Sequence, residues 1–239
     1  YPQLDERIRS TYAEQSNAKL KKDLYDSYIR SIRWASDRIK DKGIVCYVTN
    51  GKFIDGNNMD GLRKSLMQEF TSIYCFNLRG SIRGRSGDDV KREGQNVFDI
   101  MTGVAITLLV KNPYKQGECE LFYHDIGDYL SRKEKLDILC KGKNYQGLSW
   151  QRLRPNVDAD WINQRDVAFE SFLPLGDKVD EVQETVFDLY SLGVVTNRDT
   201  WAYNFSKSAL QENMQRMISF YNIQVGQFIR EHEGKNLKN

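Results

Sequence analysis

The sequence predicts an α/β protein in which half of a doubly wound sheet is followed by a mixed α+β region. Helical and extended patterns alternate over the first 117 residues, and the extended runs are short, apolar and rich in β-branched side chains. The chain has 239 residues with 40% hydrophobic content, which is enough for one large domain, or a domain and a half, with its own core.

The first helix is expected over residues 20–39, where apolar side chains recur at steps of three and four, and Gly43 ends it. Residues 43–50, GIVCYVTN, are typical of a buried parallel strand whose carboxyl end opens onto a loop. A second helix is expected over 60–70 and a second strand over 72–78.

Residues 103–111, GVAITLLVK, predict a third strand, which Asn112-Pro113 terminates and which is expected to run antiparallel at an edge. The region from 118 to 239 is less regular. It predicts a strand over 118–126 and helices over 129–139, 179–191 and 206–233. The last helix carries one apolar stripe, which we expect to be buried in a core; its members are Leu210, Met214, Met217, Ile218, Tyr221, Val225 and Phe228.

Composition excludes several classes of protein. The four cysteines (Cys46, Cys75, Cys119 and Cys140) lie far apart and there are two histidines, so neither a disulfide framework nor a zinc site is expected. The longest apolar run, 104–110, is too short to span a bilayer and the first residues have no signal-peptide pattern. We therefore expect a soluble, cytoplasmic protein, and a first residue other than Met suggests an internal piece of a longer polypeptide.

Charge divides unevenly along the chain although the net charge is only +2. Residues 1–117 hold 20 Lys and Arg against 14 Asp and Glu, whereas the remainder holds 15 against 19. A polyanion should therefore prefer the first part.

A basic, glycine-rich loop is expected at residues 79–96. Its glycines fit no nucleotide-binding motif, but its long cationic side chains can reach the phosphates of nucleic acid. A solvated surface loop is the alternative interpretation. The candidate DNA contacts here are Arg79, Arg83, Arg85, Lys91 and Arg92.

A second polar and aromatic cluster, TNRDTWAYN, lies at 196–204. Arg and Asn can bind base edges while Trp stacks, so this composition suits base reading. A helix-capping turn packed around Trp201 explains it equally well.

Together these stretches resemble the DNA adenine-N6 methyltransferase segment of the single-chain Type I-like restriction–modification enzymes called Type ISP. The resemblance runs through YPQLDERIRSTYAEQS, DLYDSYIRSIRWASDRI, GIVCYVTNGKFIDG, FNLRG, REGQNVF, GVAITLLVKNP, FYHDIGDYLSRKEKL and TNRDTWAYNFS, spread over most of the chain. In that family a nuclease and an ATP-driven translocase precede the methyltransferase, and a target-recognition region follows it.

The resemblance implies that residues 1–117 are the C-terminal half of a Rossmann-like methyltransferase sheet, and that residues 118–239 are a linker and target-recognition region. It places the S-adenosylmethionine loop and the catalytic NPPY motif upstream of Tyr1. Asn112-Pro113-Tyr114 lacks the second proline of that motif and is better explained as a strand terminator. This chain alone is therefore expected to hold no catalytic residue, to bind the cofactor poorly and to transfer no methyl group.

The resemblance also assigns a role to Phe98. Related adenine methyltransferases place an aromatic residue in the pattern VF-x₅-VAI-x₄-K, where it stacks on the extruded adenine, and Val97, Phe98, Val104 and Lys111 fit this pattern. The alternative is that Phe98 fills the core beneath the loop.

Base reading is expected in the second part, with duplex DNA and the upstream part of the same polypeptide as partners. The acidic balance of this part argues against that role unless its carboxylates face other domains. The alternatives are a non-catalytic DNA-binding or scaffold module and a small-molecule α/β enzyme. Because a truncated sheet leaves unpaired backbone, self-association is also expected. The residues expected to read bases are Trp161, Arg165, Asn197, Arg198 and Trp201.

Overall fold

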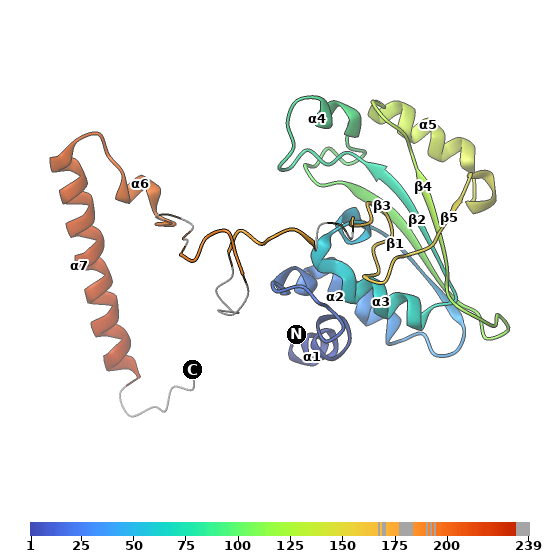
Figure 1. Cartoon of the computed structure of the whole chain (residues 1–239), viewed down its shortest axis with the longest axis horizontal. Coiled ribbons are helices and arrows are strands. Elements are labelled where there is room, and N and C mark those ends of the chain that lie inside the picture. The colour runs from blue at the N-terminus through green and yellow to red at the C-terminus, as the bar shows by residue number, and fades with distance from the viewer. Residues whose placement is uncertain are drawn as a thin grey trace. The chain divides into compact units, whose positions relative to one another are not determined.

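The computed structural model describes residues 1–166, 168, 171–176, 184–189, 191, 193 and 195–232. It forms two compact units, residues 1–169 and 170–239, each described by itself (Figure 1). The division lies well beyond the expected boundary at 117, because the strand that follows residue 117 joins the sheet of the first unit.

The first unit is built on one five-stranded mixed sheet in the order β1-β3-β2-β4-β5. All three strands predicted in the first part are present, as is the one predicted at 118–126. β2 pairs with β4 in parallel, and the other neighbouring pairs are antiparallel. The strands are β1 (Gly43–Asn50), β2 (Ser72–Arg79), β3 (Val104–Lys111), β4 (Glu120–Asp125) and β5 (Gln151–Leu153).

Two details of the expected sheet are corrected. β1 is an edge strand antiparallel to β3, not a strand buried between parallel neighbours, and β3 lies between β1 and β2 instead of at an edge. The long segment 80–103 reverses the chain after β2, so β3 returns antiparallel and pairs with both strands. The C-terminal half of a Rossmann-like methyltransferase sheet stays a prediction, since it concerns strands outside this chain.

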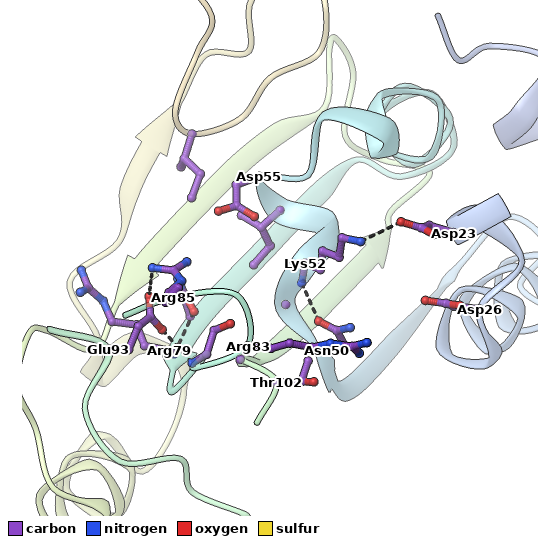
Figure 2. Close-up of a pocket in the computed structure, with 16 residues that line it drawn as sticks. Asp23, Asp26, Asn50, Lys52, Asp55, Arg79, Arg83, Arg85, Glu93 and Thr102 are labelled. Carbon is purple, nitrogen blue, oxygen red and sulfur yellow. Dashed lines mark hydrogen bonds and ion pairs between the residues drawn. The ribbon is translucent and has the colours of Figure 1, made fainter. Parts of the chain in front are cut away.

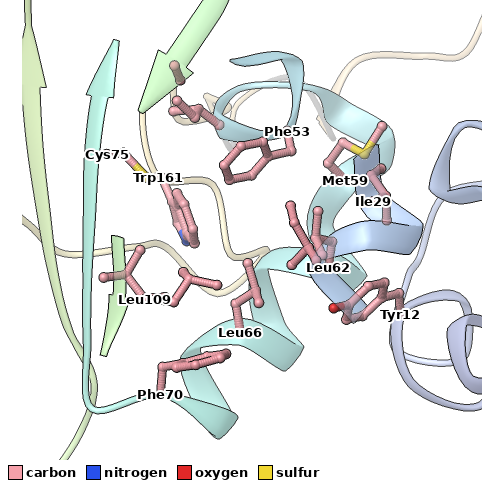
Figure 3. Packing of buried hydrophobic residues seen from close by; sticks show 14 of the residues in the cluster. Tyr12, Ile29, Phe53, Met59, Leu62, Leu66, Phe70, Cys75, Leu109 and Trp161 are labelled. Carbon is pink, nitrogen blue, oxygen red and sulfur yellow. The ribbon is translucent and has the colours of Figure 1, made fainter. Parts of the chain in front are cut away.

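One face of the sheet is covered by helices from the first third of the chain. These are α1 (Pro2–Ile8), which continues into a π-helical turn (Arg9–Ala13), α2 (Ser27–Ser36) and α3 (Asp60–Glu69). The helix predicted over 20–39 is shorter, because Asp26 adopts an extended conformation between a 3-10 turn (Lys22–Tyr25) and α2. Alternate strand residues such as Ile73 and Leu109 meet Leu62 and Leu66 of α3 in the core beneath (Figure 3).

A buried arginine fastens the segment after β5 to α3. Arg63 is fully buried, and its guanidinium donates hydrogen bonds to the carbonyls of Ala159 (2.6 Å), Phe53 (3.0 Å) and Gly56 (2.8 Å). It also lies 3.1 Å from the carboxylate of Asp160. A buried charge requires such partners, so this segment is a structural part of the first unit.

The other face of the sheet receives α5 (Arg132–Gly142), which a capping box between Ser131 and Glu134 begins. The prediction of a helix over 129–139 is confirmed to within a few residues. Lys135 of α5 is fully buried, and its ammonium donates to the carbonyls of Leu78 (2.9 Å) and Glu93 (2.8 Å). It thereby joins α5 to the end of β2 and to the short helix α4 (Asp88–Glu93).

The second unit contains α6 (Asp199–Ala202) and the 25-residue helix α7 (Lys207–Glu231), which Ser206 caps through the N–H of Ala209 (3.3 Å). The predicted long helix is confirmed, but the burial of its apolar stripe is not. No residue of α7 is buried, because within the described part of this unit only α6 packs extensively against it. The helix predicted over 179–191 falls partly outside the described residues, and its described part, residues 184–189 and 191, is not helical.

Further 3-10 turns lie at Gly51–Ile54, Asn57–Met59 and Tyr145–Gly147. Across the described ranges, no helix is both long enough and apolar enough to cross a membrane.

Candidate nucleic-acid interface

A polar cavity of about 630 Å³ opens at the carboxyl ends of β1 and β2 (Figure 2), and we name it the strand-end cleft. In α/β sheets, ligands commonly bind beyond the carboxyl ends of the strands. Asn50 ends β1 and Arg79 ends β2. The charged side chains that line the cleft are Asp23, Asp26, Asp55 and Glu93 with Lys52, Arg79, Arg83 and Arg85.

The turn after β1 shapes one wall of the cleft. The side-chain oxygen of Asn50 accepts a hydrogen bond from the backbone N–H of Lys52 (2.9 Å), and the ammonium of Lys52 donates to Asp23 (2.7 Å). Hydrogen bonds from Lys52 and from Asn58 hold the pKa of Asp23 below its usual range. Sequence reasoning missed Asn50, Lys52 and Asp23, although the polar pair that closes the strand was the available signal.

Three of the five predicted cationic contacts are engaged within the protein. Arg79 forms ion pairs with Asp125 (2.7 Å), the last residue of β4, and with Asp128 in the segment that follows this strand. Arg85 pairs with the nearly buried Glu93 (2.7 Å), and Arg92 lies 3.5 Å from Asp128. These arginines therefore fix the conformation of the loop.

Arg83 and Lys91 differ from the other three. Both are exposed, and neither side chain forms a hydrogen bond or an ion pair in the part of the chain that the structure describes. Arg83 lies at the rim of the strand-end cleft, and Lys91 lies in α4. A guanidinium or ammonium without a protein partner can bind phosphate without first breaking an ion pair.

Four carboxylates and four cationic side chains line the cleft, so it is not a site for anions alone. Burial raises the pKa of Asp55, which faces the cleft together with the other three carboxylates. Such a mixture of donors and acceptors suits a ligand that presents both, as base edges do, better than phosphate alone.

A tight turn at 96–102 presents Phe98 to solvent. The amide of Asn96 donates to the carbonyls of Gly80 (3.1 Å) and Thr102 (2.7 Å), while its oxygen accepts from the N–H of Phe98 (2.9 Å). Phe98 is 58% exposed and does not fill the core beneath the loop. It lines a hollow of about 330 Å³, the Phe98 hollow, with residues from the end of β1: Val48, Thr49 and Asn50.

Two predicted base readers of the first unit are placed differently from what was expected. Trp161 is 2% exposed and packs edge-on against Phe53 (6.0 Å between ring centroids), which corrects its prediction as a base-reading residue. Its large apolar ring is more stable in the core. Arg165 is tied to Asp160 through two hydrogen bonds (2.9 and 3.1 Å), so its guanidinium is already engaged.

The cluster at 196–204 has features of both interpretations that its sequence allows, a turn packed around Trp201 and a set of accessible polar side chains. Trp201 lies in α6 and Arg216 of α7 stacks over its ring at 5.7 Å. Arg198 precedes this helix, and within the described part of the chain its guanidinium donates one hydrogen bond, to the neighbouring carbonyl of Asn197 (2.7 Å). The side chains of Asn197, Arg198 and Trp201 stay at least partly accessible.

No group of three or more His, Cys, Asp or Glu side chains that could hold a metal ion occurs among the residues described.

Comparison with known proteins relates both units to one class of enzyme. Residues 185–237 match the Type ISP C-terminal specificity domain. No curated protein matches the chain.

Three solved structures are similar along nearly the whole chain. The ATP-dependent Type ISP restriction–modification enzyme LlaBIII bound to DNA is 43% identical over 93% of this chain, with a TM-score of 0.87. A nuclease-deletion mutant of the Type ISP enzyme LlaGI, in complex with a DNA substrate mimic, is 41% identical over 98% (TM-score 0.86). The DrdV–DNA complex is 36% identical over 93% (TM-score 0.82). The chain spans 15%, 22% and 22% of these three proteins, respectively.

Proposed function

We propose that this chain is the part of a Type ISP restriction–modification enzyme that holds target DNA and carries the beginning of its specificity region. The carrying observation is the similarity to DNA-bound Type ISP enzymes over both units, together with the specificity-domain match at 185–237. A binding and specificity module is the minimal form of this proposal, and it requires no chemistry within this chain.

In the first unit, Arg83 and Lys91 bind phosphates of the duplex. Arg79, Arg85 and Arg92 keep the loop in the shape that presents these two cations, because their own charges are satisfied by carboxylates. Phosphate contacts of this kind hold the register of a protein on DNA, and sequence is read elsewhere.

A finer proposal concerns the target adenine. Phe98 stacks on the extruded base, and the upstream part of the polypeptide supplies the NPPY motif and S-adenosylmethionine. The exposure of Phe98 and the hollow beside the end of β1 support this role. An aromatic platform contributes about 1–3 kcal/mol per stacked base, which offsets part of the cost of extrusion.

The outer edge of β1 supports the proposal that the sheet continues into an upstream methyltransferase segment. Ile44 and Val48 of this strand are 64% and 51% exposed on the face opposite α2 and α3, and Cys46 between them is exposed as well. β1 also has no partner strand on its outer side in the described part of the chain. An additional strand with its helix would bury these side chains.

Specificity is proposed for the second unit. The matched specificity region contains three accessible side chains suited to this role: Asn197, Arg198 and Trp201. The first two can form hydrogen bonds with base edges, and the ring of Trp201 can stack on a base. Residues 170–239 hold 7 Lys and Arg against 10 Asp and Glu, and this net negative charge indicates that the second unit contributes little to phosphate binding.

The salt dependence of DNA affinity tests the proposal. We expect the affinity of the 239-residue chain for duplex DNA to fall steeply with salt, and Arg83→Ala/Lys91→Ala to reduce the slope of log K against log [salt] by about 2. Fluorescence anisotropy at several salt concentrations measures both quantities. Lys141→Ala, at the far end of α5, is the matched control and should leave the slope unchanged. An affinity that is absent or independent of salt contradicts DNA binding.

A further inference from the structure

The turn that carries Phe98 exposes two further large apolar side chains. Ile100 is 49% exposed and Met101 is 59% exposed, although both lie in a well-ordered hydrogen-bonded segment. Water-exposed apolar clusters on a fixed turn are typical of surfaces that become covered on binding.

The turn is held rigidly. In addition to the three hydrogen bonds of Asn96, the carbonyl of Met101 accepts the backbone N–H groups of Ile82 (3.0 Å) and Arg83 (3.2 Å). Gly80 has a positive φ of 83°, and a Cβ there would lie 2.8 Å from the Cα of Asn96, so the two strands of the loop approach closely. The apolar tip is thus preorganised, and the entropy cost of ordering it on binding is small.

The three apolar side chains separate two hollows. Phe98 and Ile100 line the Phe98 hollow, whereas Ile100 and Met101 line a second hollow of about 850 Å³ between the loop and the start of α5. Lys91 lines this second hollow, and the backbone of Arg83 is bonded to Met101. An apolar tip flanked by two unpaired cations is complementary to the base stack of DNA between its phosphates.

We propose that Met101 inserts into the base stack of duplex DNA at the position that the extruded base leaves, which rests on the DNA-binding function proposed above. Inserted apolar side chains compensate for lost stacking, and methionine is unbranched and adapts to an irregular gap. Phe98 then receives the extruded base on one side of the turn while Met101 fills the gap on the other. Met101 acts as a positioning residue and takes no part in the methyl transfer.

Duplexes with a single abasic position test this proposal with the 239-residue chain and without cofactor. An abasic site offers the gap without the cost of extrusion. We expect the chain to bind an abasic duplex about fivefold tighter than the intact duplex of the same sequence. In the abasic duplex no base has to be unstacked before the side chain inserts, and fivefold corresponds to part of the free energy of one stacking interaction.

Met101→Ala should abolish this preference, and Met101→Leu should restore most of it. Leu136→Ala removes another exposed apolar side chain, on α5, and is the matched control that should keep the preference. Binding to both duplexes with equal affinity by the unmodified chain overturns the insertion of Met101 and leaves the proposed function intact. Binding to neither duplex overturns both, and a preference that survives Met101→Ala assigns it to another residue.

Discussion

Asp160 joins three parts of the first unit through a single carboxylate. It accepts hydrogen bonds from Arg63 (3.1 Å), from Arg165 (2.9 and 3.1 Å) and from Asn156 (3.1 Å). Burial by itself would raise the pKa of this carboxyl group, but the hydrogen bonds from Arg165 and Asn156 outweigh it and hold the pKa below its usual value. The ionised form is therefore the one that stabilises the fold.

Asp160→Asn should lower the free energy of unfolding by about 3 kcal/mol at neutral pH, because it leaves the buried Arg63 without its counter-ion. The folded-state pKa is depressed, so the contribution of Asp160 is complete above about pH 4, the ordinary range of an aspartate, and is lost as the pH falls through the folded value. The difference between the variant and the parent chain should therefore shrink in acid. Urea unfolding at a series of pH values measures it.

Asp158→Asn is the control, since the carboxylate of Asp158 forms no hydrogen bond or ion pair in the described part of the chain. An Asp160→Asn variant as stable as the parent at neutral pH would show that Arg63 is satisfied by its three carbonyls alone.

At the scale of elements, the segment 80–103 combines a cationic loop with a rigid turn. Asn96 forms three hydrogen bonds that close the turn, and it lies between the short helix α4 and Phe98. Replacing Asn96 should therefore change the conformation of the turn that carries Phe98 and Met101 more than it changes the packing of the core.

Asn96→Ala should lower the free energy of unfolding by about 1–3 kcal/mol and speed hydrogen exchange at the amide of Phe98, because that N–H loses its acceptor. Amide exchange followed by mass spectrometry or NMR detects this change. Asn144→Ala removes a similar turn after α5, where Asn144 accepts from the N–H of Gln146 (2.9 Å), and should leave the exchange of Phe98 unchanged. Unaltered protection of Phe98 in Asn96→Ala would mean that the backbone bonds of Met101 suffice to hold the turn.

At the scale of the whole molecule, β1 leaves one edge of the sheet without a partner strand in the described chain. The apolar side chains beside this edge, Ile44 and Val48, are exposed. Exposed edges of this kind promote strand-to-strand association.

The isolated chain should therefore self-associate in a concentration-dependent manner, and Val48→Lys should shift the equilibrium toward monomer because charged side chains protect an edge. Sedimentation velocity at increasing protein concentration measures the shift. Leu136→Lys places the same charge on an exposed position of α5 and should have no effect if association uses β1. A chain that is monomeric at every concentration would indicate that this edge is protected in solution.

Local pattern in the sequence determined most of the elements and the basic loop. Periodicity located α3, α5 and α7, and apolar runs located β1 to β4, because both signals depend on neighbouring residues. Composition also located the cations of the loop, whereas the role of Phe98 was implied by the resemblance to a known family and not by local pattern. Local sequence pattern could not predict the strand order, because strand pairing joins residues far apart in the chain, such as Gly43 with Lys111.

Only the tertiary structure decided which of the predicted residues are available for binding. Arg79, Arg85 and Arg92 form ion pairs with carboxylates that the fold brings to them, so three of the five predicted cations stabilise the loop. The other two, Arg83 and Lys91, form no ion pair with any residue that the structure describes. The burial of Trp161 likewise depends on tertiary contacts, because its ring packs against Phe53, which lies more than a hundred residues earlier in the chain. Composition specifies what a side chain can bind, whereas the neighbours that the fold brings to it determine whether that capacity is already used.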